Sequence, residues 1–325
     1  MIRAVIRAFG PAPETVRIEP YEPPPLDGGM VRVRMIASAI NPSDIVTISG
    51  AYATRTPLPF VPGFEGVGVV EAVAADVTGL AVGDRVLPVG SAGAWQEVKT
   101  TEARWCFRVP DALSDERAAT GYINPLTAWV MLNERAGQAP GARVVVNAAG
   151  SAIGRILIRM ANRRGVEPVA LVRSSAAHAL LEGLGVAAVL NSSCPDLGAR
   201  LAEASGGRGY DLALDAVGGG EGAILALALR PGGRMIHYGL LSGQPLPPGL
   251  PARRQDVVLE YFWLRNWVHA AGRETMERGL AAVWDLAIDG VAASAIEARY
   301  SLPAVTDALV HDGRPGRNGK VLITL

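Results

Sequence analysis

Residues 143–173 read RVVVNAAGSAIGRILIRMANRRGVEPVALVR. Arg143–Asn147 is predicted to form a short buried strand, and residues 148–154 a turn of small residues. The apolar spacing over Arg155–Arg164 predicts a helix, and Pro168–Val172 predicts a second strand. A strand, a small-residue turn, a helix and a second strand together make the phosphate-binding unit of dinucleotide-binding domains. This stretch therefore predicts an α/β fold with a doubly wound parallel sheet.

The turn and the residue that follows the second strand predict a bound dinucleotide. Small residues let the backbone approach a pyrophosphate closely, and the first N–H groups of a helix favour an anion. Where NAD sites carry an acidic residue, this chain has Arg173, followed by Ser174 and Ser175. A guanidinium suits a phosphate dianion and the hydroxyls add hydrogen bonds, so NADPH is the predicted cofactor. A solvated charge at a strand end is the alternative interpretation of Arg173.

Length, charge and the few cysteines and histidines argue against several classes of protein. The 325 residues suit two domains, and 31 basic residues balance 31 acidic ones, so we expect no nucleic-acid partner. The chain has no apolar run of about 18 residues and no signal-peptide pattern, so we expect a cytoplasmic protein that binds no membrane. Cys106 and Cys194 form no disulfide framework, and no histidine is paired at metal-ligand spacing, so no metal site is expected.

The pattern of strands divides the chain into parts. The first third is β-rich, with clusters of Pro and Gly between strands, which suits a partly open barrel. Its strands are expected at Met1–Phe9, Met30–Ile40, Gly66–Ala74 and Arg85–Pro88. Strands then alternate with helices, as in a doubly wound sheet. Six are expected: Arg143–Ala148, Pro168–Arg173, Ala187–Leu190, Leu212–Ala216, Arg234–Tyr238 and Val257–Phe262. We therefore expect a dinucleotide-binding domain over 116–265, inserted in a catalytic or substrate domain over 1–115 and 266–325.

This layout resembles the medium-chain dehydrogenase/reductase superfamily over essentially the whole chain. Gly63–Val70 resembles its early G-x-E-G-x-G strand, and Leu80–Val86 resembles its G-D-x-V turn. The resemblance implies a GroES-like β domain with an inserted six-stranded Rossmann sheet. Where the zinc enzymes of the superfamily have cysteine and histidine ligands, this chain has Asn41 and Phe64, so the resemblance is to the zinc-free branch.

Within that branch the chain is most similar to the mitochondrial-type trans-2-enoyl thioester reductases. Tyr122–Trp129 resembles their N-P-x-T-A-aromatic segment, and Glu260–Trp267 resembles their F-W-L-x-x-W segment. Quinone oxidoreductases share Tyr52 but match these segments less well. The resemblance implies NADPH-dependent hydride transfer to the β-carbon of an activated C=C bond, in an enoyl thioester linked to CoA or an acyl carrier protein. A quinone or α,β-unsaturated ketone reductase and a non-catalytic NADPH-binding protein are the alternatives.

The resemblance also implies roles for single residues. Tyr52 is the expected proton donor, and Trp263 is expected to line the substrate channel, with packing as the alternative for both. Cofactor contacts are expected from Asn124, Gly150, Ser151, Ala152, Ile153, Gly154, Arg173, Ser174, Ser175, Tyr238, Gly239, Leu240, Leu241, Phe262, Trp263, Leu264, Arg265 and Lys320. A homodimer is implied as well, with the edge of the cofactor-domain sheet expected within Ala216–Pro251.

Four other polar residues receive plainer interpretations. Lys320 either reaches a cofactor phosphate or is an exposed charge near the C-terminus. Asp44 follows Pro42 and Ser43 and is predicted to cap the next helix. Glu65 is predicted to be a buried structural carboxylate, and His237 to be a hydrogen-bonded residue of a sheet strand.

Overall fold

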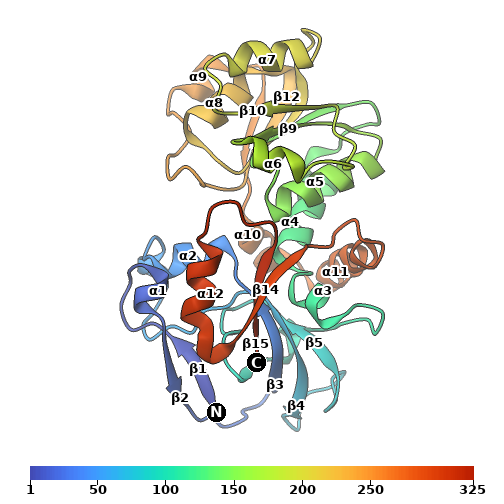
Figure 1. Ribbon diagram of the computed structural model, residues 1–325. Coiled ribbons are helices and arrows are strands. Elements are labelled where there is room, and N and C mark those ends of the chain that lie inside the picture. Colours follow the sequence, from blue (N-terminus) through green and yellow to red (C-terminus); the bar gives the residue numbers. More distant parts are fainter. The chain divides into compact units, whose positions relative to one another are not determined.

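A computed structural model describes residues 1–325, apart from the side chain of Ser175. The Ser175 hydroxyl, which is expected to contact the cofactor, therefore lies outside the described residues. The chain divides into two compact units (Figure 1). Residues 1–123 and 267–325 form the split unit, and residues 124–266 form the inserted unit. The functional roles expected of the two parts stay predictions.

The inserted unit contains the parallel sheet that the sequence predicts. Its strands are β8 (Arg143–Val146), β9 (Glu167–Val172), β10 (Ala188–Asn191), β11 (Tyr210–Asp215), β12 (Leu229–His237) and β13 (Val258–Tyr261). They lie in the order β10-β9-β8-β11-β12-β13, and each neighbouring pair is parallel. The chain moves outward from β8 first to one side and then to the other. Ligands of open parallel sheets bind at such a reversal, beyond the carboxyl ends of the strands.

Helices alternate with these strands, as the sequence pattern predicts. They are α5 (Ala152–Arg163), α6 (Ser175–Ala179), α7 (Leu197–Ala204), α8 (Gly219–Leu227) and α9 (Leu250–Arg253). One core cluster joins Leu171 of β9, Leu201 of α7 and Leu225 of α8, whose side chains are fully buried. Full burial of a leucine contributes about 1.5–3 kcal/mol, so this contact fixes the helices on the sheet.

The split unit is built from both ends of the chain. β3 (Met30–Ala39) lies before the inserted unit and pairs with β15 (Lys320–Thr324), which lies after it. The sheet runs β14-β15-β3-β4-β5-β7, with β6 also paired to β3. The other strands of this unit are β1 (Ile2–Val5), β2 (Arg17–Pro20), β4 (Gly66–Val73), β5 (Arg85–Pro88), β6 (Val98–Glu102), β7 (Cys106–Arg108) and β14 (Ile296–Ser301). A β-rich unit interrupted by an insertion is the arrangement that the sequence predicts.

Helices complete the split unit. They are α1 (Ala12–Thr15), α2 (Pro42–Ile48), α3 (Asp115–Ala119), α11 (Arg273–Ile288) and α12 (Val305–Asp312), while α4 (Ile123–Val130) and α10 (Leu264–Ala270) cross the border between the units. The strand predicted over Met1–Phe9 is too long. β1 ends at Val5 because Ile6 pairs with Phe60 instead of β2, and Pro11 then starts α1.

The expected position of the sheet edge is wrong. β13 forms one edge of the parallel sheet, and it begins at Val258, beyond the expected range Ala216–Pro251. The sequence predicts the strand over Val257–Phe262, but it does not show that this strand pairs outside β12 and so forms the edge. The side chains of Val258 and Tyr261 on this edge are 45% and 70% exposed.

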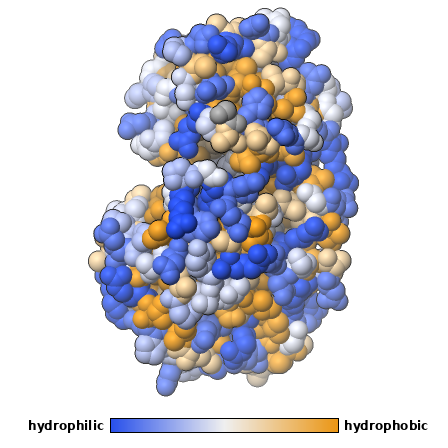
Figure 2. Space-filling view, viewed as in Figure 1, coloured by the Kyte–Doolittle hydropathy of each residue, from blue (hydrophilic) through white to orange (hydrophobic). Residues whose placement is uncertain are grey.

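The described residues contain no helix that combines the length and the apolar character needed to span a bilayer. On the face shown in Figure 2, hydrophilic and hydrophobic residues are interspersed over each unit.

Candidate functional site

The small-residue turn after β8 forms the start of α5. Ser151 is the N-cap of this helix, and its Oγ accepts a hydrogen bond from the Gly154 N–H at 3.1 Å. A Cβ atom at Gly154 would lie 2.6 Å from the carbonyl oxygen of Ala148, so only glycine fits there. The N–H groups of Ala152 and Ile153 in the first turn have no intrahelical acceptor. The turn thus presents N–H donors at the positive end of a helix dipole, which suits a phosphate.

Arg173 and Ser174 lie directly after β9, at the same edge of the sheet. Both side chains are exposed. The Ser174 Oγ caps α6 by accepting a hydrogen bond from the Ala177 N–H at 3.3 Å. One of the two hydroxyls that the sequence suggests for a phosphate therefore has a structural task, whereas the Arg173 guanidinium is available to solvent.

Glu221, on the first turn of α8, is a residue that the sequence analysis missed. Burial raises the pKa of its carboxyl, and the positive charge of Arg173 opposes that rise. Ser192, after β10, and Asn147, after β8, also oppose it through hydrogen bonds. Glu221 therefore lies among residues from the carboxyl ends of three strands. The glycine triplet directly before Glu221 could have indicated this position in the sequence, because it resembles the small-residue turn before α5.

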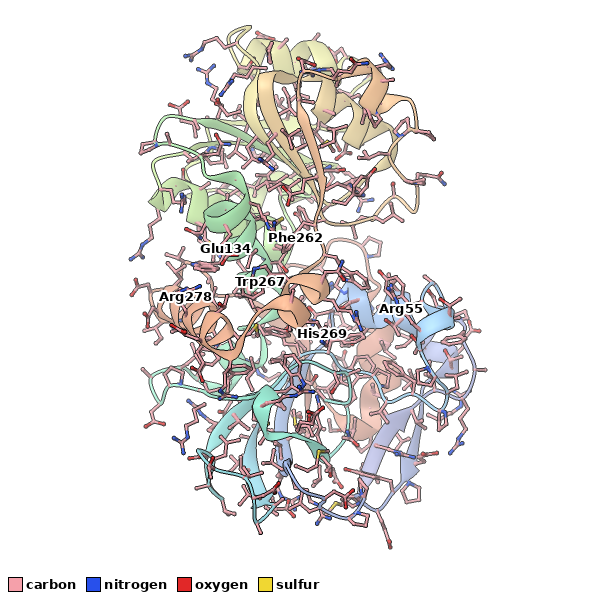
Figure 3. The ribbon with its side chains drawn as sticks, turned by 180° about the vertical axis from the view of Figure 1, so that it is seen from behind. Arg55, Glu134, Phe262, Trp267, His269 and Arg278 are labelled. Atoms are coloured by element: carbon pink, nitrogen blue, oxygen red, sulfur yellow. The ribbon has the colours of Figure 1, made fainter. Side chains whose placement is uncertain are left out.

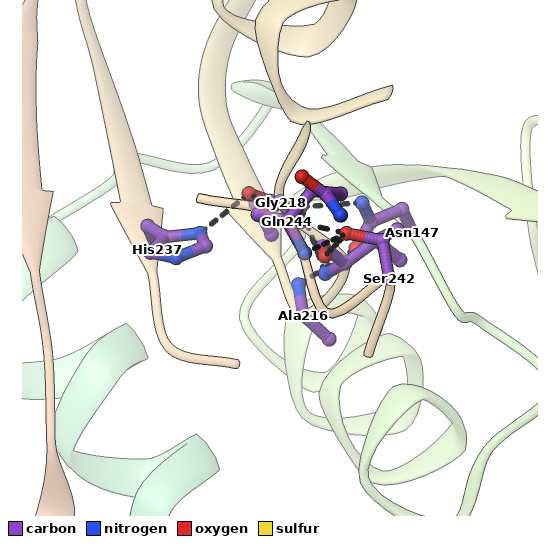
Figure 4. A network of polar contacts seen from close by, with 8 residues as sticks. Asn147, Ala216, Gly218, His237, Ser242 and Gln244 are labelled. Atoms are coloured by element: carbon purple, nitrogen blue, oxygen red, sulfur yellow. Dashed lines mark hydrogen bonds and ion pairs between the residues drawn. The ribbon is translucent and has the colours of Figure 1, made fainter. Parts of the chain in front are cut away.

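A buried network crosses the reversal point between β8 and β11 (Figure 4). Asn147 Nδ2 donates to Asp215 Oδ1 at 2.6 Å, and Asn147 Oδ1 accepts from the Ala216 N–H at 2.8 Å. The Asp215 carboxylate also accepts from the Gly218 N–H at 3.0 Å and contacts His237 Nδ1 at 2.6 Å. Burial alone would raise the pKa of Asp215, but these donors outweigh it and hold the pKa below its usual range. The hydrogen-bonded role predicted for His237 is confirmed.

The network fixes the loop that contains the expected cofactor residues after β12. The Tyr238 N–H donates to the Asp215 carbonyl at 2.9 Å. A Cβ atom at Gly239 would lie 2.8 Å from the carbonyl oxygen of Ala216, so the two loops touch through their backbones. Leu240 and Leu241 point outward and are 51% and 58% exposed.

The remaining expected cofactor residues of the inserted unit lie at the end of β13 and the start of α4. Phe262 is buried, and its N–H donates to the His237 carbonyl at 2.9 Å (Figure 3). Trp263 is half-buried, with the Arg265 guanidinium 5.7 Å from its ring centre. Leu264 is buried at the start of α10. The other expected residue, Asn124, is half-buried on the first turn of α4.

The inserted unit has features that fit a dinucleotide. The first turn of α5 presents the N–H groups of Ala152 and Ile153, which have no acceptor within the helix, and Gly154 permits tight packing of the turn. The Tyr238 hydroxyl is buried and has no hydrogen-bond partner among the described residues, so it fits a partner supplied from outside the chain. Burial, and then the charge of Asp215, raise the pKa of this phenol, which keeps it a donor at neutral pH.

Tyr52, the expected proton donor, belongs to the split unit. It is half-buried in the turn that follows α2, just before a 3₁₀ turn over Ala53–Arg55. The Arg55 guanidinium lies over its ring, 4.1 Å from the ring centre. Figure 3 shows Arg55 on this segment. The role of Tyr52 in proton transfer stays a prediction.

Lys320 also belongs to the split unit, and the alternative of an exposed charge is wrong. Its side chain is 3% exposed because β15 brings it beneath the end of β3. Its Nζ donates to the Ile40 carbonyl at 2.9 Å and to Asn41 Oδ1 at 2.5 Å. Burial lowers the pKa of Lys320, and the charge of Glu65 opposes that shift. The expected contact with a cofactor phosphate stays a prediction.

Two polar residues near Lys320, Asp44 and Glu65, have the structural roles that the sequence predicts. Asp44 Oδ2 accepts from the Asn41 N–H at 2.9 Å at the start of α2, which confirms its capping role. Its other oxygen accepts from the N–H groups of Gly63 at 3.0 Å and Phe64 at 3.1 Å. Glu65 is 1% exposed, which confirms a buried carboxylate.

Two family models match the chain. Residues 27–111 match the alcohol dehydrogenase GroES-like domain, and residues 152–283 match the family described as zinc-binding dehydrogenase. The mitochondrial enoyl-[acyl-carrier-protein] reductase of Arabidopsis thaliana is 33% identical over 89% of this chain and 79% of its own length. The chain belongs to the zinc-free medium-chain dehydrogenase/reductase family.

Solved structures agree with this membership. A candidate NADPH:quinone reductase of Bacillus thuringiensis is 34% identical, with a TM-score of 0.94 over 100% of this chain and 98% of its own. A mycobacterial protein in complex with NADPH is 27% identical, with a TM-score of 0.89 over 100% of both chains. This member of the family is an oxidoreductase.

In this zinc-free reductase fold, the expected site residues fall into two groups. One group lies at the carboxyl edge of the parallel sheet and consists of Gly150–Gly154, Arg173, Ser174 and Tyr238–Leu241. Tyr52 and Lys320 belong to the split unit. Over the described part of the chain, His, Cys, Asp and Glu residues form no group of three or more that could hold a metal ion.

Proposed function

We propose that this oxidoreductase uses NADPH to reduce the activated C=C bond of a trans-2-enoyl thioester. One observation carries the proposal: a chain that is 33% identical to an enoyl-[acyl-carrier-protein] reductase presents a helix N-terminus and an exposed Arg173 at one edge of its parallel sheet. The first suits a pyrophosphate and the second suits a 2′-phosphate. The complex of the mycobacterial relative with NADPH supports this cofactor.

Residues of the inserted unit would hold the cofactor. The N–H groups of Ala152 and Ile153 would bind the pyrophosphate, and Arg173 with Ser174 would bind the 2′-phosphate. Further contacts are proposed from Asn124, Gly150, Ser151, Gly154, Tyr238, Gly239, Leu240, Leu241, Phe262, Trp263 and Leu264. When bound, NADPH supplies the hydride that is added to the β-carbon of the alkene.

Tyr52 would complete the reduction. Addition of hydride to the β-carbon leaves negative charge on the thioester oxygen and requires a proton at the α-carbon. The phenol of Tyr52 can donate a hydrogen bond to that oxygen and a proton to that carbon. The Arg55 guanidinium over its ring restrains the ring plane. Trp263 is proposed to line the channel for the acyl chain.

A quinone or α,β-unsaturated ketone reductase is the second candidate. The similarity to the Bacillus thuringiensis protein over 100% of this chain, at 34% identity, favours it. Both candidates share the fold, the cofactor and the role of Arg173, and they differ in the acceptor of the hydride.

Oxidation of NADPH with a panel of acceptors tests the proposal. The panel consists of crotonyl-CoA, longer enoyl-CoAs, 1,4-benzoquinone and a simple enone. Turnover of the enoyl-CoAs that rises with chain length supports the enoyl thioester. Turnover of quinone or enone alone would instead support the second candidate function. NADPH binding without turnover of any acceptor would point to a non-catalytic binding protein.

We also propose a cytoplasmic homodimer. The exposed edge strand β13, with Tyr261 70% exposed, offers unpaired backbone groups to a second sheet. Light scattering of the purified protein measures the number of chains, and fractionation of cells measures the location. A monomeric mass or an organellar location would overturn the corresponding part.

A further inference from the structure

Four polar side chains of the split unit are buried where four segments meet. Asn41 follows β3, Asp44 lies in α2, Glu65 precedes β4 and Lys320 begins β15, and each is at most 3% exposed. A buried charge is unfavourable unless it is paired and hydrogen-bonded. The proposed chemistry uses none of these four side chains, so their burial requires a separate account.

Hydrogen bonds link three of them in a row. Lys320 Nζ donates to Asn41 Oδ1 at 2.5 Å, and Asn41 Nδ2 donates to Glu65 Oε2 at 3.0 Å. An amide can serve an ammonium on one side and a carboxylate on the other in a single orientation. Asn41 therefore sets the direction between the two charges as well as joining them.

The Glu65 end of this row reaches the start of a helix. Glu65 Oε1 accepts from the backbone N–H groups of Tyr122 at 2.7 Å and Ile123 at 2.8 Å. N–H groups at a helix start have no intrahelical acceptor, and a carboxylate there also matches the helix dipole. α4 begins at Ile123, and Asn124 is its next residue. The start of α4, directly before Asn124, is thus tied to Glu65.

Asn41, the middle residue of the row, also lies at the start of α2. The backbone N–H of Asn41 donates to Asp44 at 2.9 Å, and α2 begins at the next residue, Pro42. Tyr52 lies in the turn after this helix. Asn41 therefore contributes its side chain to the row that reaches the start of α4 and its backbone N–H to the start of α2, the helix that leads to Tyr52.

We infer that Lys320 and Asn41 are positioning residues of the reductase, which hold the segment of Tyr52 in register with the start of α4 at Tyr122 and Ile123. The inference rests on the proposed function for the roles of Tyr52 and of Asn124, the residue that follows Ile123. It gives Lys320 a task inside the split unit in place of contact with a cofactor phosphate.

Three variants test the inference. Lys320→Met and Asn41→Leu break the row while keeping similar volume. Lys99→Met is the matched control, because Lys99 is 2% exposed in the same unit and donates to the Pro88 carbonyl at 3.0 Å and the Ser91 carbonyl at 2.8 Å, outside the row. Hydrogen exchange of the cofactor-free protein over residues 49–56 and 120–126 is measured, together with kcat and KM.

The row predicts that both test variants speed exchange in both segments about tenfold and lower kcat about tenfold, while the control does neither. Unchanged exchange in Lys320→Met overturns the inference and favours a direct cofactor contact. The double variant Lys320→Met, Glu65→Gln removes both charges of the row. If kcat and the melting temperature both return to the wild-type values in this variant, the row serves only to balance charge, and the inference is overturned. Absence of turnover in the wild-type protein would instead overturn the proposed function, and the exchange result would still decide the inference.

Discussion

The Arg55 guanidinium lies 4.1 Å from the centre of the Tyr52 ring. A cation over an aromatic face holds the ring by about 0.5–1 kcal/mol at an exposed site. This contact uses the face of the ring and not its hydroxyl. Removal of the hydroxyl alone therefore keeps this contact and tests the chemical role of the hydroxyl.

Tyr52→Phe is accordingly expected to lower kcat by about 100-fold, the usual effect of losing a general acid. The KM for NADPH should stay near the wild-type value, because the variant keeps the ring and its contact with Arg55. Steady-state kinetics with crotonyl-CoA measures both constants. A variant with wild-type kcat would remove Tyr52 from the mechanism.

Arg173→Ala should raise the KM for NADPH about tenfold, which corresponds to about 1.4 kcal/mol for one charge-assisted contact. The KM for NADH should change little, because NADH lacks the 2′-phosphate. Arg208→Ala is the control, since Arg208 is exposed in the same unit but precedes β11 and so lies at the other end of the strands. Equal losses with NADPH and NADH would contradict the assignment of Arg173.

The carboxyl of Asp44 predicts a pH dependence of stability. Burial raises its pKa from 3.8 to about 7, although N–H donors from Asn41, Phe64 and Gly63 oppose the rise. The folded protein then keeps a proton that the unfolded chain releases. The resulting stabilisation is complete below about pH 3.8 and is lost as the pH rises toward 7.

Urea unfolding of the wild type and Asp44→Asn over this range tests that sign. As the pH rises through this range, the free energy of unfolding of the wild type should fall relative to that of the variant, by at most about 1.4 kcal/mol per pH unit. Asparagine cannot titrate, so the difference reports Asp44 alone. Parallel pH profiles, or a relative gain for the wild type as the pH rises, would show that the pKa of Asp44 is not raised.

Activity is expected to be independent of zinc. Elemental analysis of the active protein should find well under one equivalent of zinc per chain, and a chelator should leave turnover intact. Loss of activity with the chelator, restored by added Zn²⁺ alone, would overturn this expectation.

The parts of the site that sequence predicted are local ones. The turn before α5 was predictable because Ser151, Gly154 and the flanking strands lie within one short stretch, and hydrophobic spacing marks the strands themselves. The same reasoning located Arg173, since it needs only the end of β9. The capping role of Asp44 follows from its neighbours Pro42 and Ser43.

The parts that sequence did not predict depend on which strands become neighbours. Asn147 and Asp215 meet because β8 and β11 are adjacent in the sheet, and spacing along the chain does not give that order. Lys320 is buried because β15 pairs with β3, which no local pattern near the C-terminus reveals. The sheet edge was misplaced for the same reason, since β13 adds to the sheet beyond β12.

The central claim, hydride transfer to the β-carbon of an enoyl thioester, is tested most directly with NADPH deuterated at both C4 positions. Crotonyl-CoA is reduced with this cofactor, and the product is examined by mass spectrometry and NMR. The account predicts butyryl-CoA that carries one deuterium, at C3. Deuterium at C2, or no deuterated product while a quinone is reduced in parallel, would contradict it.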